Sequence, residues 1–146
     1  MKRVRRVGLA VSMFAALSFY SASAFASPGL CYYSFGNGQW GSGGFTNSFD
    51  SPIFTVTNSS KVCTINGWQD TGSSVSPANV EYRLYQYGIL SNTLYGSTRI
   101  SGNYTQSGSW YSYTYTGVDP NQKYFLRMYP HSTAGISGAG NAYDGY

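Results

Sequence analysis

From residue 27 onward, the chain consists of short segments in which apolar and polar side chains alternate, each followed by a turn. In the clearest segment, residues 80–87, the apolar side chains fall on one face of an extended strand. Residues 109–116 alternate in the same way, and we expect the face with Tyr111, Tyr113 and Tyr115 to point inward. Helical periodicity is absent after the first 26 residues, so the pattern predicts an all-β fold. The residues expected to face the core from two of its strands are Val80, Tyr82, Leu84, Tyr124, Leu126 and Met128.

Frequent turn signals divide the rest of the chain into further short strands. The other strands are expected at residues 31–35, 53–57, 61–66, 94–100 and 123–129, with a short final strand at 142–143. Residues 67–79 and 130–140 are rich in Gly and Ser, and we expect both to be loops. Many short strands with turns between them are typical of a sandwich or barrel. We predict a small antiparallel β-sandwich that forms one domain over residues 27–146.

The first 26 residues have the pattern of a secretion signal. A cationic start precedes an apolar run, and Ala24-Phe25-Ala26 forms an A-x-A cleavage site. We therefore expect cleavage near Ala26 and a secreted, extracellular protein. Four of the nine basic residues lie in this signal, which leaves five basic and five acidic residues. The near-neutral balance argues against nucleic-acid partners, and no second apolar run is long enough for membrane insertion.

Two cysteines, Cys31 and Cys63, follow the signal. In an exported protein a single pair is most simply a disulfide, so we expect a Cys31–Cys63 bridge. A redox or metal-binding pair is the alternative, although no second cluster of ligands accompanies the two cysteines.

Residues 116–128 resemble the corner between strands E and F, and strand F itself, in fibronectin type III domains, which are immunoglobulin-like β-sandwiches. The matching features are a glycine, an aliphatic residue, a proline, and a tyrosine that starts a strand containing an arginine: Gly117, Val118, Pro120, Tyr124 and Arg127. In that family the tyrosine hydroxyl binds the backbone of the corner, so the resemblance implies the same role for Tyr124. It also implies that residues 80–87 are similar to strand C, beside strand F, and that residues 61–68 are similar to strand B.

Few residues are suited to catalysis. His131 is the only histidine; it lies in an expected loop, and the chain has no Gly-x-Ser-x-Gly motif. A carboxylate pair for glycoside hydrolysis is conceivable, but Asp70, Asp119 and Asp144 adjoin turn residues. Loop aspartates can bind calcium, but the sequence contains no Asp-x-Asp spacing that would favour such a site. The glycine motif at residues 36–41 has no helix after it, so it does not indicate a dinucleotide site. We expect no catalytic activity, no cofactor and no metal.

Aromatic side chains are the remaining functional signal. The chain contains 15 Tyr, 8 Phe and 3 Trp, and its Tyr, Ser, Gly and Asn content resembles that of antibody binding loops. If residues 80–87 and 123–129 are neighbours, their outward faces combine rings with guanidinium groups, which suit binding. The candidate ligand-binding residues are Tyr85, Tyr87, Phe125, Arg127 and Tyr129. Stabilisation of the sheet through cross-strand pairs is the alternative role of these residues.

These observations predict a secreted, non-catalytic binding protein. The predicted partner is a glycan, a cell-wall polymer or another protein at the cell surface. Two alternatives stay open: a secreted antimicrobial or toxin-like protein, and a small secreted hydrolase that uses His131 or a carboxylate pair.

Overall fold

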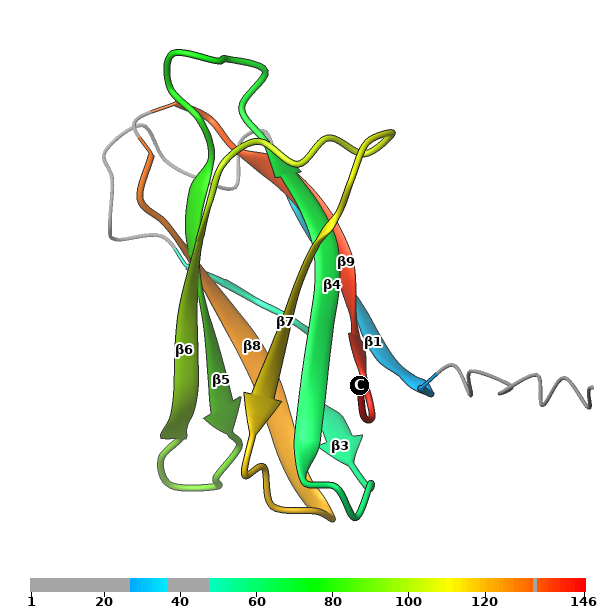
Figure 1. The fold of residues 1–146 in the computed structure, drawn as a ribbon. Helices are drawn as coiled ribbons and strands as arrows, with labels where there is room; N and C mark the ends of the chain where they lie inside the picture. The colour runs from blue at the N-terminus through cyan, green and yellow to red at the C-terminus, as the bar shows by residue number, and fades with distance from the viewer. Residues whose placement is uncertain (1–26, 37–47, 133) are drawn as a thin grey trace, which may run out of the picture.

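Two antiparallel sheets face each other in the computed structural model, which describes residues 27–36, 48–132 and 134–146 (Figure 1). The first sheet, sheet A, has the order β1-β9-β4-β7; the second, sheet B, has the order β2-β8-β5-β6, and β3 also pairs with β8. The strands are β1 (Gly29–Phe35), β2 (Phe49–Asp50), β3 (Phe54–Val56), β4 (Val62–Asp70), β5 (Asn79–Gln86), β6 (Thr93–Ser101), β7 (Tyr111–Thr116), β8 (Gln122–Pro130) and β9 (Ser137–Tyr143). The predicted all-β architecture of a small sandwich is confirmed.

The predicted signal segment and most of the glycine-rich loop after β1 lie outside the described residues. In the part of the chain that the structure describes, no helix has the length and hydropathy needed to cross a membrane.

The core lies between the two sheets and is rich in tyrosine. All six residues that the alternation assigns to the core in β5 and β8 are completely buried. Tyr111 and Tyr115 of β7 are buried as expected, but Tyr113 between them is 38% exposed. The expectation for Tyr113 is wrong because β7 is the edge strand of sheet A, where the opposite sheet covers the middle ring only in part.

Buried tyrosine hydroxyls form hydrogen bonds with one another across the sandwich. The hydroxyl oxygens of Tyr33 and Tyr111 are 2.9 Å apart, and Tyr111 donates to the hydroxyl of Tyr82 over 2.8 Å. Tyr82 in turn donates to the side-chain carbonyl of Gln69 over 3.0 Å, and the Gln69 amide donates to the Ile100 carbonyl over 2.9 Å. This chain of bonds explains how polar groups are tolerated in the core, since a buried polar group without a partner is costly.

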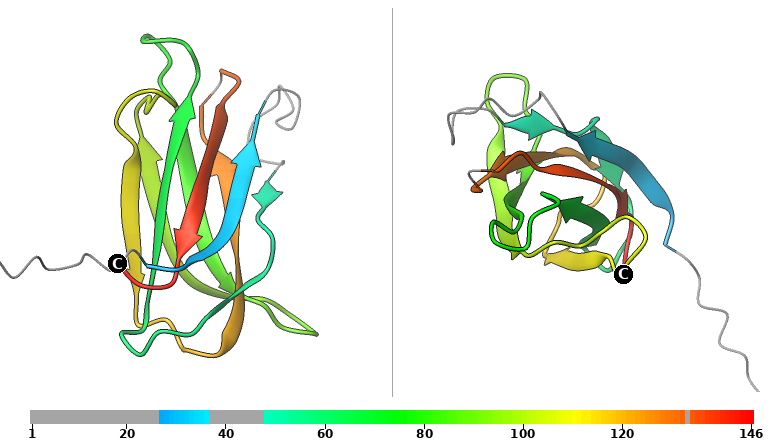
Figure 2. Two further views of the ribbon diagram at one scale, coloured as in Figure 1. Left: turned by 90° about the vertical axis from the view of Figure 1, so that its right-hand side faces the viewer. Right: turned by 90° about the horizontal axis from the view of Figure 1, so that it is seen from above.

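β9 corrects the expectation that residues 130–140 form a loop. Residues 137–143 form a strand in the interior of sheet A, between β1 and β4 (Figure 2). Its glycines are needed there: a Cβ on Gly138 would lie 2.4 Å from the Phe35 ring, and one on Gly140 would lie 2.5 Å from the Tyr33 hydroxyl. Two aromatic side chains of β1 therefore lie across β9, and tertiary packing overrides the low strand propensity of glycine.

The predicted Cys31–Cys63 disulfide is wrong, because both cysteines are free thiols. Cys31 is in β1 and Cys63 is in β4, and β9 lies between these strands. Strands two places apart in a sheet are about 9.5 Å apart, whereas a disulfide joins Cα atoms about 4.4–6.8 Å apart. Burial raises the pKa of Cys63 to about 12 and also raises that of Cys31.

The corner between β7 and β8 carries the predicted tyrosine contact. The Tyr124 hydroxyl donates to the carbonyl of Asp119 over 2.9 Å, and Tyr124 and Val118 are completely buried. Gly117 has a φ of 74°, a backbone conformation that glycine adopts without strain. This corner carries the chain from sheet A to sheet B.

The end of β9 is bound to two other parts of the chain. Asp144 accepts hydrogen bonds from the backbone amides of Thr57 and Asn58, over 3.0 and 3.1 Å, and its own amide donates to the Pro28 carbonyl over 2.8 Å. The hydroxyl of Ser27 donates to the carbonyl of Tyr146. Residue 27 and the C-terminus therefore lie side by side (Figure 2).

Candidate binding face

Alternating side chains of β5 and β8 form the solvent side of sheet B, which we call the outer face. The two strands are in register so that Arg83 pairs with Arg127, Tyr85 with Phe125, and Glu81 with Tyr129. Four of the five predicted ligand-binding residues, Tyr85, Phe125, Arg127 and Tyr129, are therefore brought together, as the sequence indicated.

Each arginine of the outer face is held by a carboxylate and a ring. Arg83 donates two hydrogen bonds to Glu81, over 2.8 and 3.1 Å, and its guanidinium lies 4.4 Å from the centre of the Tyr129 ring. Arg127 donates two hydrogen bonds of 2.6 Å to Asp50, and its guanidinium lies 5.4 Å from the Tyr85 ring. These paired contacts hold both arginines in place over the sheet.

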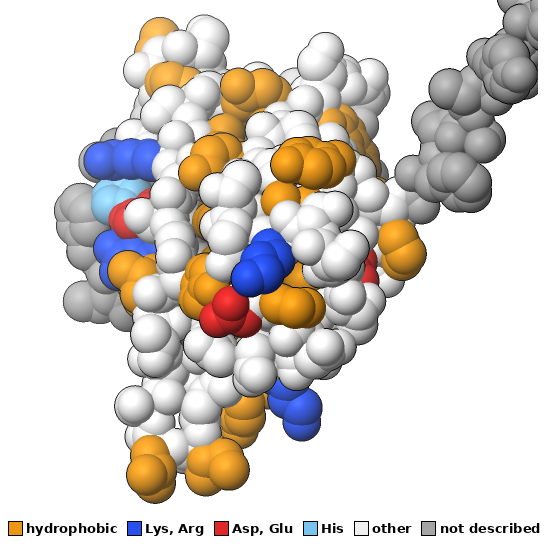
Figure 3. All heavy atoms as spheres, turned by 60° about the horizontal axis from the view of Figure 1, so that its bottom comes forward, with side chains coloured by type: hydrophobic (Ala, Val, Ile, Leu, Met, Phe, Trp, Pro, Cys, Tyr) orange, Lys and Arg blue, Asp and Glu red, His pale blue; other side chains and the backbone are white. Residues whose placement is uncertain are grey.

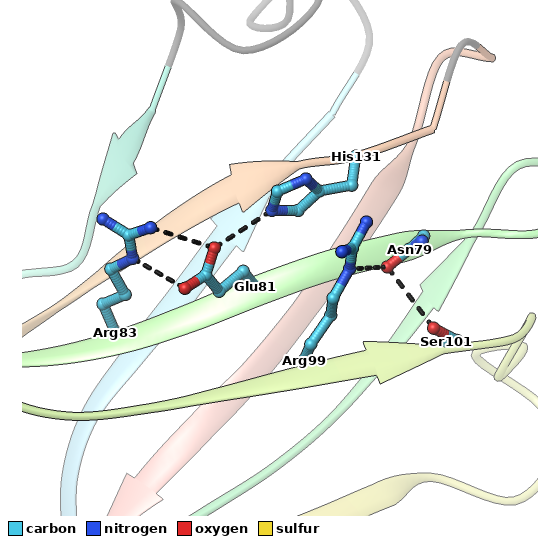
Figure 4. Close-up of polar contacts among 6 residues, drawn as sticks. All are labelled: Asn79, Glu81, Arg83, Arg99, Ser101 and His131. Atoms are coloured by element: carbon cyan, nitrogen blue, oxygen red, sulfur yellow. Dashed lines mark hydrogen bonds and ion pairs between the residues drawn. The ribbon is translucent and has the colours of Figure 1, made fainter.

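The charges of the outer face are matched locally. The hydrogen bonds from Arg83 hold the pKa of Glu81 below its ordinary value, with a contribution from His131 and against the effect of burial. Figure 4 shows Glu81 between these two partners, while Arg99 of β6 reaches Asn79. The hydrogen bonds to Glu81 and Asp50 raise the pKa of Arg83 and of Arg127, so both guanidinium groups stay charged.

The exposure of the predicted residues separates them into two groups. Phe125 is only 4% exposed, because its ring stacks on Tyr85 at 5.5 Å and Arg127 lies over it at 5.3 Å. The expectation that Phe125 is an open surface ring is therefore wrong. Tyr85, Arg127 and Tyr129 are half-buried, whereas Tyr87, which follows β5, is 44% exposed.

A shallow pocket of about 250 Å³ lies at the end of the outer face, next to the loop that joins β5 and β6. We call it the hairpin pocket. It is lined by Asp50, Ser51, Ile53, Tyr87, Asn92, Phe125 and Arg127. The sequence identified three of these residues, Tyr87, Phe125 and Arg127. It missed Asp50, because the two-residue strand β2 gives no alternation, and it missed Ile53, which lies between β2 and β3.

The loop beside the hairpin pocket exposes aliphatic side chains. Ile89 is 96% and Leu90 is 99% exposed at the tip, and Leu94, which pairs with Tyr85, is half exposed. A Cβ on Gly88 would lie 2.1 Å from the Ser91 carbonyl oxygen, so only glycine permits this tight loop. Figure 3 shows hydrophobic side chains projecting from this end of the molecule.

The residues considered for catalysis have structural contacts. The His131 imidazole Nε2 lies 3.0 Å from Glu81, and the neighbouring Ser132 hydroxyl donates to the Pro77 carbonyl. Asp70 accepts the amide of Gly72 over 2.8 Å, as expected for a turn aspartate. Within the described residues, no group of three or more His, Cys, Asp or Glu side chains is placed to hold a metal ion.

No protein-family model matches this chain, and no curated protein is significantly similar to it in sequence.

Proposed function

We propose that this is a secreted, non-catalytic binding protein that attaches to another protein at the cell surface. The proposed contact is the hairpin pocket together with the loop between β5 and β6. The observation that carries the proposal is that exposed apolar side chains of this pocket and loop lie at the end of the outer face that also holds the Arg127–Asp50 ion pair. The exposed apolar residues are Ile53, Tyr87, Ile89, Leu90 and Leu94.

A protein partner suits this surface better than a glycan does. Contiguous exposed apolar side chains mark protein contacts, because their burial removes apolar area from water. The Arg127–Asp50 pair beside them adds directional hydrogen bonds at the edge of the patch, and arginine and tyrosine are enriched among residues that dominate interface energies. Ile89 and Leu90 are aliphatic, so they offer no flat ring on which a sugar can stack.

The arginines and rings of the outer face then have a supporting role. They hold β5 and β8 rigid beneath the loop, and a preorganised surface loses less conformational entropy on binding. The proposed contact residues therefore lie in the pocket and loop that adjoin the predicted strands, rather than on the sheet itself.

We also propose that the sandwich is related in architecture to fibronectin type III and immunoglobulin-like domains. The Tyr124 contact at the corner and the neighbouring positions of β5 and β8 support this relationship. The last strand differs: β9 lies in sheet A between β1 and β4, whereas in the immunoglobulin arrangement the final strand lies beside strand F. The architecture itself implies no particular partner.

Binding of the purified protein to intact cells of the producing organism tests the proposed function. We expect saturable binding that is lost when the cells are first treated with a protease, and lost in the Ile89→Ser/Leu90→Ser variant. These two residues contact solvent, so the variant should keep the stability of the parent. Val75→Ser is the matched control, since Val75 is 93% exposed and lies in the loop between β4 and β5.

Two results would overturn the proposal. Binding that survives protease treatment of the cells would point to a glycan or polymer partner. Equal binding by the Ile89→Ser/Leu90→Ser variant would show that the loop is not the contact.

A further inference from the structure

A groove of about 400 Å³ lies between β6 and β7, which are edge strands of the two different sheets. We call it the edge groove. At one end the strands are in contact, since a Cβ on Gly96 would lie 3.2 Å from the Tyr115 ring. The groove opens where the end of β6 faces the start of β7. The side chains that matter for its chemistry are Arg99, Ser101, Tyr104, Trp110, Ser112 and Tyr113.

Aromatic rings line the groove, and the protein holds them in place. Trp110 is 40% and Tyr113 is 38% exposed. The Trp110 indole N–H donates to the Gln106 carbonyl over 3.0 Å, so the one polar group of this ring already has a partner. Tyr113 packs edge-on against Tyr115 with ring centres 5.0 Å apart. Rings that are fixed before binding can stack on a ligand at little entropic cost.

Neutral hydrogen-bonding groups lie beside these rings. Ser112 contributes a hydroxyl, and Ser101 contributes another, which donates to the Asn79 side chain over 3.3 Å. Arg99 is the one charged side chain among the described residues that line the groove. The Arg99 Nε donates to the Asn79 side chain over 2.8 Å, whereas its two Nη groups donate to no described residue. The groove therefore combines flat apolar faces with hydrogen-bonding groups, and the described residues that line it include no carboxylate.

We propose that the edge groove binds a neutral oligosaccharide. A sugar ring presents a face of C–H bonds, which stacks on an aromatic ring, and a rim of hydroxyls, which exchange hydrogen bonds with serine and arginine. The lining supplies both chemistries side by side, as ligand sites do when a few polar groups orient a mostly apolar contact. A nucleic acid would need several basic side chains along its backbone, and the groove has one. This inference concerns a surface other than the hairpin pocket and does not depend on the proposed protein partner.

Calorimetric titration of the full protein with four neutral hexasaccharides tests the inference. The probes are the hexamers of β-1,4-linked glucose, β-1,4-linked xylose, β-1,4-linked N-acetylglucosamine and α-1,4-linked glucose. We expect at least one to bind and to change the tryptophan fluorescence. Trp110→Ala and Tyr113→Ala should each weaken binding about tenfold or more. Tyr113→Phe, which keeps the ring, should retain most of the affinity.

The matched control is Tyr32→Ala. Tyr32 is 60% exposed on β1, the edge strand at the other side of sheet A, and its truncation should leave binding unchanged. The circular dichroism and urea midpoint of each variant separate lost binding from lost folding. The inference is overturned if none of the four sugars binds at millimolar concentration, or if Trp110→Ala and Tyr113→Ala bind as the parent does. It is also overturned if an extended peptide competes for Trp110 more strongly than every sugar.

The two proposals fail separately. Loss of the loop residues Ile89 and Leu90 should leave oligosaccharide binding intact, and loss of the Trp110 ring should leave protease-sensitive binding to cells intact.

Discussion

Arg83 and Arg127 face each other directly across β5 and β8, and each guanidinium lies over a ring from the other strand. Like charges in this position destabilise a sheet unless something compensates. Here the compensation is reciprocal, because Arg83 covers Tyr129 of β8 while Arg127 covers Tyr85 of β5. Each arginine also has its own carboxylate, Glu81 or Asp50.

Removal of one carboxylate should reveal this repulsion. We expect Asp50→Asn to lower the free energy of unfolding by about 0.5–1 kcal/mol, because Arg127 then faces Arg83 without its counter-ion. Added sodium chloride should restore part of the loss by screening the two arginines. Urea denaturation at low and high salt measures both effects. Asp70→Asn removes the same charge from a turn and should show no salt-dependent recovery.

Tyr124 should contribute strongly to stability. Tyr124→Phe removes the hydrogen bond to the Asp119 carbonyl and should cost about 0.5–1.5 kcal/mol. Tyr124→Ala also empties a completely buried site and should cost roughly 3–5 kcal/mol. Urea midpoints measure both, with Tyr32→Phe as an exposed control. An unchanged midpoint for Tyr124→Ala would mean that the corner contributes nothing to stability.

Two glycines of β9 should tolerate no larger side chain. Gly138→Ala and Gly140→Ala place a methyl group against Phe35 and Tyr33, and each should destabilise the protein by about 1–3 kcal/mol. Gly29→Ala in the same sheet has open space around the new atom and should be nearly neutral. Thermal denaturation of the three variants compares them. Equal stability of all three would contradict the packing of the β1 rings over β9.

Stability should fall in acid partly through Asp144. Burial, the largest single influence, raises the pKa of Asp144, but the hydrogen bonds from Thr57 and Asn58 together outweigh it and lower the pKa below its ordinary value. The ionised carboxylate therefore stabilises the fold above the unfolded-state pKa, and this contribution is lost as pH falls through the lower folded-state pKa. We expect Asp144→Asn to lower the melting temperature at pH 7 and to flatten its decline below about pH 4. An equal decrease in the melting temperature of Asp144→Asn at all pH values would contradict this role of Asp144.

The cysteines should titrate as free thiols. In denaturant, a thiol reagent should detect both Cys31 and Cys63 without prior reduction. In the native protein Cys63 should react slowly, because it is completely buried and burial raises its pKa to about 12. Rapid native reaction of both thiols would contradict this placement.

Local alternation predicted the parts of the fold that depend on one face of one strand. The six core positions of β5 and β8 follow from period-two alternation. The pairing of the two strands, and the contact between Tyr124 and the corner backbone, are implied by the resemblance to fibronectin type III domains. The burial of alternate residues along one strand needs only nearby sequence, which is why the residues themselves indicated it.

The features that the sequence did not predict depend on distant neighbours. The sequence of β9 resembles a loop because it is rich in glycine. The aromatic rings that leave room only for glycine there belong to β1, more than 100 residues earlier in the chain. The same strand separates Cys31 from Cys63. Phe125 alternates as an outward residue, yet Tyr85 and Arg127 cover it. The partial exposure of Tyr113 depends on the place of β7 at the edge of sheet A, which its own alternation does not indicate.

The position of β9 also determines when the protein can fold. Within the described residues, β1 pairs in its sheet only with β9, and β9 also separates β1 from β4. The first strand to be synthesised therefore has no partner until residues 137–143 are available, and until then two strand edges stay open. Pairing of such distant segments is slow, because a long loop must close first. A chain that emerges N-terminus first can therefore pair the strands of sheet B before β9 is available, but it closes sheet A only after its final strand has emerged.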